Sequence, residues 1–89
     1  MLDENEVRAR LEREDIPDVE GYHVVIREDS TGDVAAFIYV IVPDELTSRT
    51  DFIERTEGID DRVFELFSRE FQGYWPYVRF RSASEMAAL

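Results

Sequence analysis

The stretch Val34-Ala35-Ala36-Phe37-Ile38-Tyr39-Val40-Ile41-Val42 contains no charged or strongly polar side chain. A strand with one face in water alternates between apolar and polar residues, because successive side chains point to opposite faces of the sheet. A run that is apolar on both faces is typical of a central strand with cover on each side. We therefore predict that residues 34–42 form the middle strand of a sheet, and that something covers both of its faces.

Two further strands are expected to flank this one. Tyr22 to about Glu28 forms the first, and the loop Asp29-Ser30-Thr31-Gly32-Asp33 has the short polar residues and glycine of a hairpin, which makes the pair antiparallel. Tyr74 to Arg81 forms the third, with Pro76 near the start of an edge strand because proline cannot donate to the ladder. A right-handed crossover makes the third strand parallel to the second if they are neighbours. A sheet with the first strand in the centre is the alternative.

Helices are predicted before and between the strands. Asp3 and Glu6 have the spacing of a capping box, which favours a helix from about Glu4 to Glu14. Its outer face is expected to carry the ion pairs Glu4 with Arg8 and Glu6 with Arg10.

The second helical region is predicted in two pieces. Residues 46–57 have few apolar residues, among them Leu46, Phe52 and Ile53, and Gly58 is expected to interrupt the helix. A better supported helix then runs from about Asp61 to Gln72. Its apolar residues at helical spacing are Val63, Phe64, Phe67 and Phe71.

These elements predict an α+β fold of order α-β-β-α-β, with a three-stranded mixed sheet and helices mainly on one face. The chain of 89 residues is expected to be a single domain, with residues 82–89 as a loosely ordered tail. Alternation assigns the aliphatic strand residues to the core face. That set is Tyr22, Val24, Ile26, Ala36, Ile38, Val40, Val42, Val78 and Phe80.

The opposite face is aromatic and arginine-rich, and we take it as the candidate binding face. Its residues are His23, Val25, Arg27, Ala35, Phe37, Tyr39, Ile41, Trp75, Tyr77, Arg79 and Arg81. Four large rings on one face could expose an apolar area of a few hundred Å², which is about the largest exposed apolar patch that monomers usually have. The first helix, a partner or a second copy could cover it, and we favour a homodimer.

The charge of the chain limits its partners. All ten cations are arginines and 21 residues are acidic, so the net charge is -11. Adaptation to high salt and a GC-rich genome are both open explanations for this composition. The charge disfavours nucleic acids and anionic membranes as partners and favours a basic protein. There is no apolar run of membrane-spanning length and no secretory signal, so we expect a soluble cytoplasmic protein.

Few residues suggest chemistry. The absence of cysteine excludes disulfides and thiolate ligands. His23 is the only histidine, and no serine has the context of a nucleophile, so we assign no catalytic residue and expect no cofactor. Glu28, Asp29 and Asp33 are weak candidates for a metal site or a metal-dependent enzyme, because carboxylates bind hard cations. Their spacing does not match an EF-hand, and Asp29 suffices as a turn residue.

Three resemblances extend these predictions. Aromatics interleaved with arginines resemble the base-stacking platforms of RNA-binding domains, and the element order resembles KH-like modules, but the Gly-x-x-Gly clamp is absent. The same order resembles the cytosolic regulatory domains of cation-diffusion transporters, which implies dimerisation and metal sensing, although their histidines are not matched. The hairpin at residues 29–33 and Trp75-Pro76-Tyr77-Val78-Arg79-Phe80-Arg81-Ser82 are similar to segments of small stand-alone bacterial proteins of unknown activity.

Our main functional hypothesis is therefore a non-catalytic interaction protein. It would be a homodimer that acts through the candidate binding face, with the segment Leu46 to Glu57 beside it, and neutralises a basic partner. The alternatives are a KH-like module that binds single-stranded RNA or nucleotides, and a carboxylate metal-dependent enzyme or metal-sensing domain.

Overall fold

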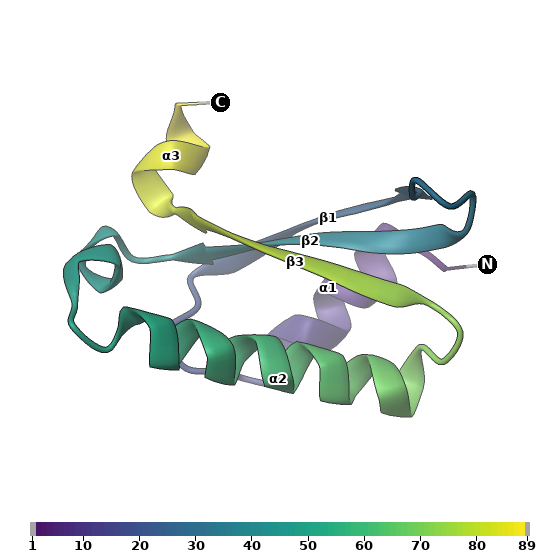
Figure 1. The fold of residues 1–89 in the computed structure, drawn as a ribbon, viewed down its shortest axis with the longest axis horizontal. Coiled ribbons are helices and arrows are strands. Elements are labelled where there is room, and N and C mark those ends of the chain that lie inside the picture. Colours follow the sequence, from purple (N-terminus) through teal and green to yellow (C-terminus); the bar gives the residue numbers. More distant parts are fainter. Residues whose placement is uncertain (1, 89) are drawn as a thin grey trace.

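The computed structural model describes residues 2–88 (Figure 1). Its elements are α1 (Glu4–Arg13), β1 (Gly21–Glu28), β2 (Val34–Val42), the short 3-10 helix η1 (Asp44–Ser48), α2 (Phe52–Glu70), β3 (Trp75–Ser82) and α3 (Ala83–Ala87). The predicted α+β class and the order α-β-β-α-β are confirmed.

The sheet has the strand order β1-β2-β3, so β2 is the central strand, as its apolar sequence predicts. β1 pairs with β2 antiparallel, and β3 pairs with β2 parallel. Val25, Phe37 and Tyr77 are direct neighbours across the three strands. This register places the aromatic and arginine residues of all three strands on one face.

Both long helices lie on the other face of the sheet (Figure 1). α1 contributes Val7 and Leu11 to the core, where both are fully buried. The core cluster also contains the predicted strand residues and the inner side of α2, including Ile59 and Leu66. The first helix therefore does not cover the aromatic face, and that alternative is wrong.

α2 is one continuous helix, which corrects the predicted interruption at Gly58. Gly58 lies inside the helix and is exposed. The cost of a mid-helix glycine, about 0.5 to 1 kcal/mol, is small beside the burial of the apolar side that continues on both sides of it. Leu46 is buried and Phe52 packs against the core, whereas Ile53 is 68% exposed. The segment 46–57 is thus better anchored than its composition indicates.

The start of α1 also differs from the prediction. Asp3 caps the helix by accepting a hydrogen bond from the Asn5 backbone N–H at 3.0 Å. Glu4 accepts a hydrogen bond from the Ile26 backbone N–H of β1 at 2.8 Å, so it is used to hold the helix against the edge strand. Arg10 pairs with Glu14 and Glu70. The predicted partners are therefore wrong: Arg8 pairs with Glu12 further along the helix, and Glu4 makes a tertiary contact.

Residues 83–87 form the short helix α3, within the region where the sequence indicates a loosely ordered tail. Ser82 and Glu85 make a complete capping box at the start of α3. The Ser84 backbone N–H also donates to Asp44 Oδ1 of η1 at 3.1 Å.

Across residues 2–88, every helix is too short or too polar to cross a membrane.

Candidate functional site

The face of the sheet turned away from α1 and α2 is called the outer face here. It has the residues predicted for the candidate binding face, at alternate positions of the three strands. Arg27, Arg79 and Arg81 lie on it, and no acidic residue occupies any of these alternate strand positions. In a chain with 21 acidic residues, this face is a local concentration of positive charge.

The arginines of the outer face lie over its aromatic rings. The Arg27 guanidinium carbon is 3.7 Å from the centre of the Phe37 ring, and that of Arg81 is 5.3 Å from the Tyr39 ring. Phe37 and Tyr77 stack with their centres 4.9 Å apart. Each cation–π contact of this kind contributes about 0.5 to 1 kcal/mol at an exposed site. Arginines of the same chain therefore cover part of the aromatic surface, and the rings are half-buried.

The hydrogen bonds of these arginines go to backbone carbonyls. Arg27 donates to Glu28 O, Arg79 donates to Val78 O, and Arg81 donates to Phe80 O. Elsewhere the arginines pair with carboxylates, as Arg10, Arg49, Arg55 and Arg69 do. Among the described residues, no carboxylate forms an ion pair with the three arginines of the outer face. Direct contact with a carboxylate therefore does not neutralise these three charges in the described residues.

Trp75 takes a different position from the other predicted site residues. Its ring packs edge-on against Phe64 of α2, with ring centres 5.2 Å apart, and it is 58% exposed. It therefore lies at the edge of the sheet, between the outer face and the helical layer. The structure brings together His23, Arg27, Phe37, Tyr39, Tyr77, Arg79 and Arg81, and leaves Trp75 beside them.

One end of the outer face is hollowed into an open pocket of about 520 Å³. It is lined by His23, Val25, Tyr39, Arg81 and Met86. The His23 and Tyr39 rings have their centres 5.9 Å apart. We call this the His23 pocket. Sequence reasoning missed Met86, because no local pattern shows that this residue of α3 lines a pocket with residues of all three strands.

The weak metal candidates of the hairpin serve the loop instead. Asp29 Oδ1 accepts hydrogen bonds from the Thr31 N–H and hydroxyl and from the Asp33 N–H, and Oδ2 accepts one from the Tyr77 hydroxyl at 3.0 Å. These bonds, the Thr31 hydroxyl first, lower the pKa of Asp29 to about 2. Glu28 and Asp33 are exposed and complete no ligand set. Within residues 2–88, no group of three or more His, Asp or Glu side chains is placed to hold a metal ion.

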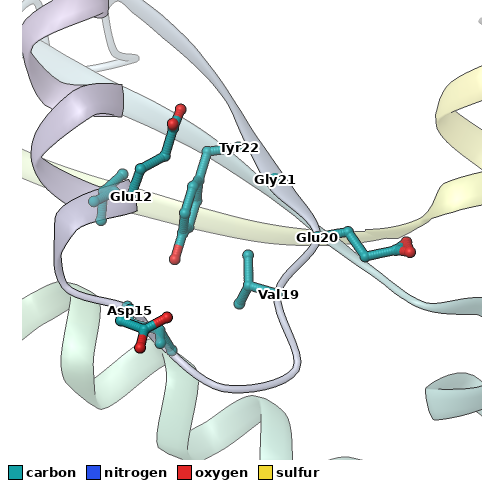
Figure 2. A pocket seen from close by; sticks show the side chains of 8 residues that line it. Glu12, Asp15, Val19, Glu20, Gly21 and Tyr22 are labelled. Carbon is teal, nitrogen blue, oxygen red and sulfur yellow. The ribbon is translucent and has the colours of Figure 1, made fainter.

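A second pocket lies between the end of α1 and the start of β1, with a volume of about 230 Å³ (Figure 2). Glu12, Asp15 and Glu20 line it, but Figure 2 shows the Glu20 carboxylate turned away from Tyr22. The Tyr22 hydroxyl is buried here without a hydrogen-bond partner. Burial raises the pKa of Tyr22 to about 12. The acids here do not converge into a ligand set.

Comparisons with known proteins identify the fold. No family model matches the sequence, and no curated protein matches it. The copper form of the MamM C-terminal domain is similar in structure, with a TM-score of 0.61 at 20% identity over 88% of this chain and 79% of that one. The metal-bound C-terminal domain of the CzcD transporter from Cuprividus metallidurans has a TM-score of 0.54 at 15% identity, over 90% of this chain and 99% of that one.

The chain shares the fold of the MamM and CzcD C-terminal domains. This likeness overturns our main functional hypothesis, a non-catalytic interaction protein that acts on a basic partner. The similar structures include one domain determined in a copper form and one determined in a metal-bound form. The similarity to small stand-alone bacterial proteins and the RNA-binding alternative stay predictions.

Proposed function

We propose that this chain is a metal-responsive regulatory domain that works as a cytoplasmic homodimer. The observation that supports the proposal is the extent of the structural match. The likeness covers 88 to 90% of this chain and 79 to 99% of the two neighbours, so it involves the whole domain and not a shared motif. At 15 to 20% identity, the ligands themselves must be argued from this chain's own residues.

A single copy does not fit a resident metal site. Within residues 2–88 no three metal-ligating side chains converge. The ligand set of a metal-responsive domain built from this chain must therefore be completed by a second copy.

His23 is the residue most suited to such a shared site. Copper and zinc prefer nitrogen and sulfur ligands, and this chain has one imidazole and no cysteine. His23 is exposed on an outer strand, where a second copy can approach it. A two-fold dimer places the same patch of each copy in contact, so it can bring two imidazoles to one ion.

The test is a titration with Cu²⁺, Zn²⁺ and Mg²⁺, followed by thermal unfolding and by sedimentation. We expect Cu²⁺ or Zn²⁺, but not Mg²⁺, to raise the unfolding midpoint and the dimer fraction together. A ligand at 100 times its Kd stabilises the folded state by about 2.7 kcal/mol, which is a readily measured shift.

His23→Gln is the decisive variant, since it removes the imidazole and keeps a polar side chain of similar size. Glu20→Gln removes an exposed carboxylate nearby in sequence and is the matched control. The response to metal should be lost in the first variant and kept in the second. No response of the unmodified chain to any of the three metals, at concentrations where it is dimeric, would contradict the proposal.

A further inference from the structure

Apart from His23, the residues of the His23 pocket have no part in the proposed function, and together they have the features of a small-molecule site. Its volume of about 520 Å³ lies within the range of about 300 to 1,000 Å³ that is usual for ligand pockets. Its lining is mostly apolar, with Val25 and Met86 as walls. The other three lining residues, His23, Tyr39 and Arg81, have polar groups in their side chains. Apolar walls with a few convergent polar groups are what small ligands require.

Arg81 decides which charge the pocket accepts. Its Nη1 donates to Phe80 O at 2.9 Å, and it forms no ion pair with a described carboxylate. No acidic residue lines the pocket, although nearly a quarter of the chain is acidic. A guanidinium presents five N–H donors in a planar fork, so Arg81 keeps donors for a bidentate carboxylate. The pocket is thus complementary to an anion in a protein that otherwise repels anions.

The strength of the positive charge limits the ligand to a single negative charge. One guanidinium balances one carboxylate, whereas a phosphate monoester carries about two negative charges at neutral pH. The net charge of -11 penalises the second charge, because the field of the whole protein opposes it. A carboxylate is therefore a better match than a phosphate.

Met86 and the Tyr39 ring define the rest of the ligand. Methionine is flexible and polarizable, so it packs against irregular apolar or aromatic shapes. The Tyr39 ring, already beneath Arg81, extends the apolar floor of the pocket. We infer that the His23 pocket binds a small organic monocarboxylate, with its carboxylate on Arg81 and its apolar or aromatic body against Val25, Tyr39 and Met86.

The test uses benzoate and hexanoate as probes, with benzamide as the neutral analogue of benzoate. Each is titrated into isotopically labelled protein at constant ionic strength, and shifts are followed by NMR. We expect saturable shifts that centre on Val25, Tyr39 and the Met86 methyl group, and no comparable shifts with benzamide. Shifts that spread over the surface, or equal binding of benzamide, would overturn the inference.

Two arginines of β3 provide a matched pair of variants. Arg81→Gln should weaken benzoate binding about tenfold or more, since hydrogen bonds to charged groups are among the strong ones. Arg79→Gln removes the same charge from the same face, but Arg79 does not line the pocket. The affinity for benzoate should therefore change by less than about twofold, apart from the effect of the altered net charge. Equal losses in both variants would show that the probe responds only to net charge.

A further variant keeps the result decisive. Arg81→Lys retains the charge but not the planar fork, and should bind more weakly than the unmodified chain if the fork holds the carboxylate. Should Arg81→Gln fail to fold, this variant carries the test. His23 lines the pocket as well, so the two proposals are separated by Arg81→Gln, which keeps the imidazole and should lose benzoate binding while it retains the metal response proposed above. Failure of one proposal is therefore distinguishable from failure of the other.

Discussion

Replacing Tyr22 by Phe should stabilise this protein. The Tyr22 ring belongs to the core cluster, and its hydroxyl is buried without a hydrogen-bond partner in the described structure. An unsatisfied buried polar group costs about 1 to 3 kcal/mol, while the substitution keeps the ring and removes only the oxygen. After allowing for the small void that remains, we expect the free energy of unfolding to rise by about 1 kcal/mol at neutral pH.

The alkaline pH dependence gives an independent measure of the same residue. Burial raises the pKa of Tyr22 from 10.0 to about 12. The unfolded chain therefore loses the Tyr22 proton at a lower pH than the folded protein does. Because of this difference, the free energy of unfolding should fall as the pH rises from about 10 to about 12. The fall is about 1 to 2 kcal/mol once solvent screening is allowed for. The Phe variant should lack this loss.

The assay is urea unfolding of both proteins at pH 7, 9, 10 and 11, with Tyr39→Phe as the control. Tyr39 is half-buried on the outer face, and its substitution should change the stability by less than about 0.5 kcal/mol. Tyr77, whose pKa is also raised because it donates to Asp29, is present in both proteins and cancels in the comparison. A Phe variant that is less stable at pH 7 would show that the hydroxyl has a partner and refute the reasoning.

Three further predictions follow from the core, the helix and the hairpin. Gly58→Ala should stabilise by about 0.5 to 1 kcal/mol in urea unfolding, because the added methyl meets no atom within 4 Å; a loss would show that the glycine is needed. Ile38→Val in the fully buried centre of β2 should cost about 0.5 to 1.5 kcal/mol in the same assay, and no cost would mean a loosely packed core. The pKa of Asp29 is lowered from 3.8 to about 2, so protonation of Asp29 should reduce the thermal stability as the pH falls from about 4 to about 2. The side chain of Asp29→Asn does not titrate, so this variant should lose less stability over that interval. Equal losses in the two proteins would contradict the prediction.

The strands could be predicted from sequence because their signals are local. Val34 to Val42 has the predicted bounds, since a run that is apolar on both faces is bounded by polar turns. The helices were less predictable. Gly58 is a local signal for a break, but Phe52, Ile59 and Val63 on one side of the helix outweigh it through contacts with the sheet. Glu4, similarly, accepts a hydrogen bond from the Ile26 backbone N–H and does not pair with Arg8. This contact depends on a strand residue 22 positions away in the sequence, which no local pattern shows.

The candidate site was partly predictable for the same reason. Strand alternation places His23, Tyr39 and Arg81 on one face without knowledge of the tertiary structure. The pocket between them requires Met86, whose position depends on the Ser82 cap and on the contact between Ser84 and Asp44. Trp75 has the strand position that alternation predicts, but its ring packs against Phe64 of α2 at the edge of the sheet. Long-range contacts therefore decide what the pattern leaves open.

The cover of the outer face shows why aromatic area alone is weak evidence for a partner. The aromatic content of Phe37, Tyr39 and Tyr77 predicts a surface that the first helix, a partner or a second copy covers. In the structure, Arg27 and Arg81 lie over two of these rings and Phe37 stacks on Tyr77, so the face is partly covered by its own side chains. Guanidinium groups do this well because they are weakly hydrated and stack on rings. Aromatic area therefore gives little support to the proposed homodimer, which the metal titration with sedimentation tests directly.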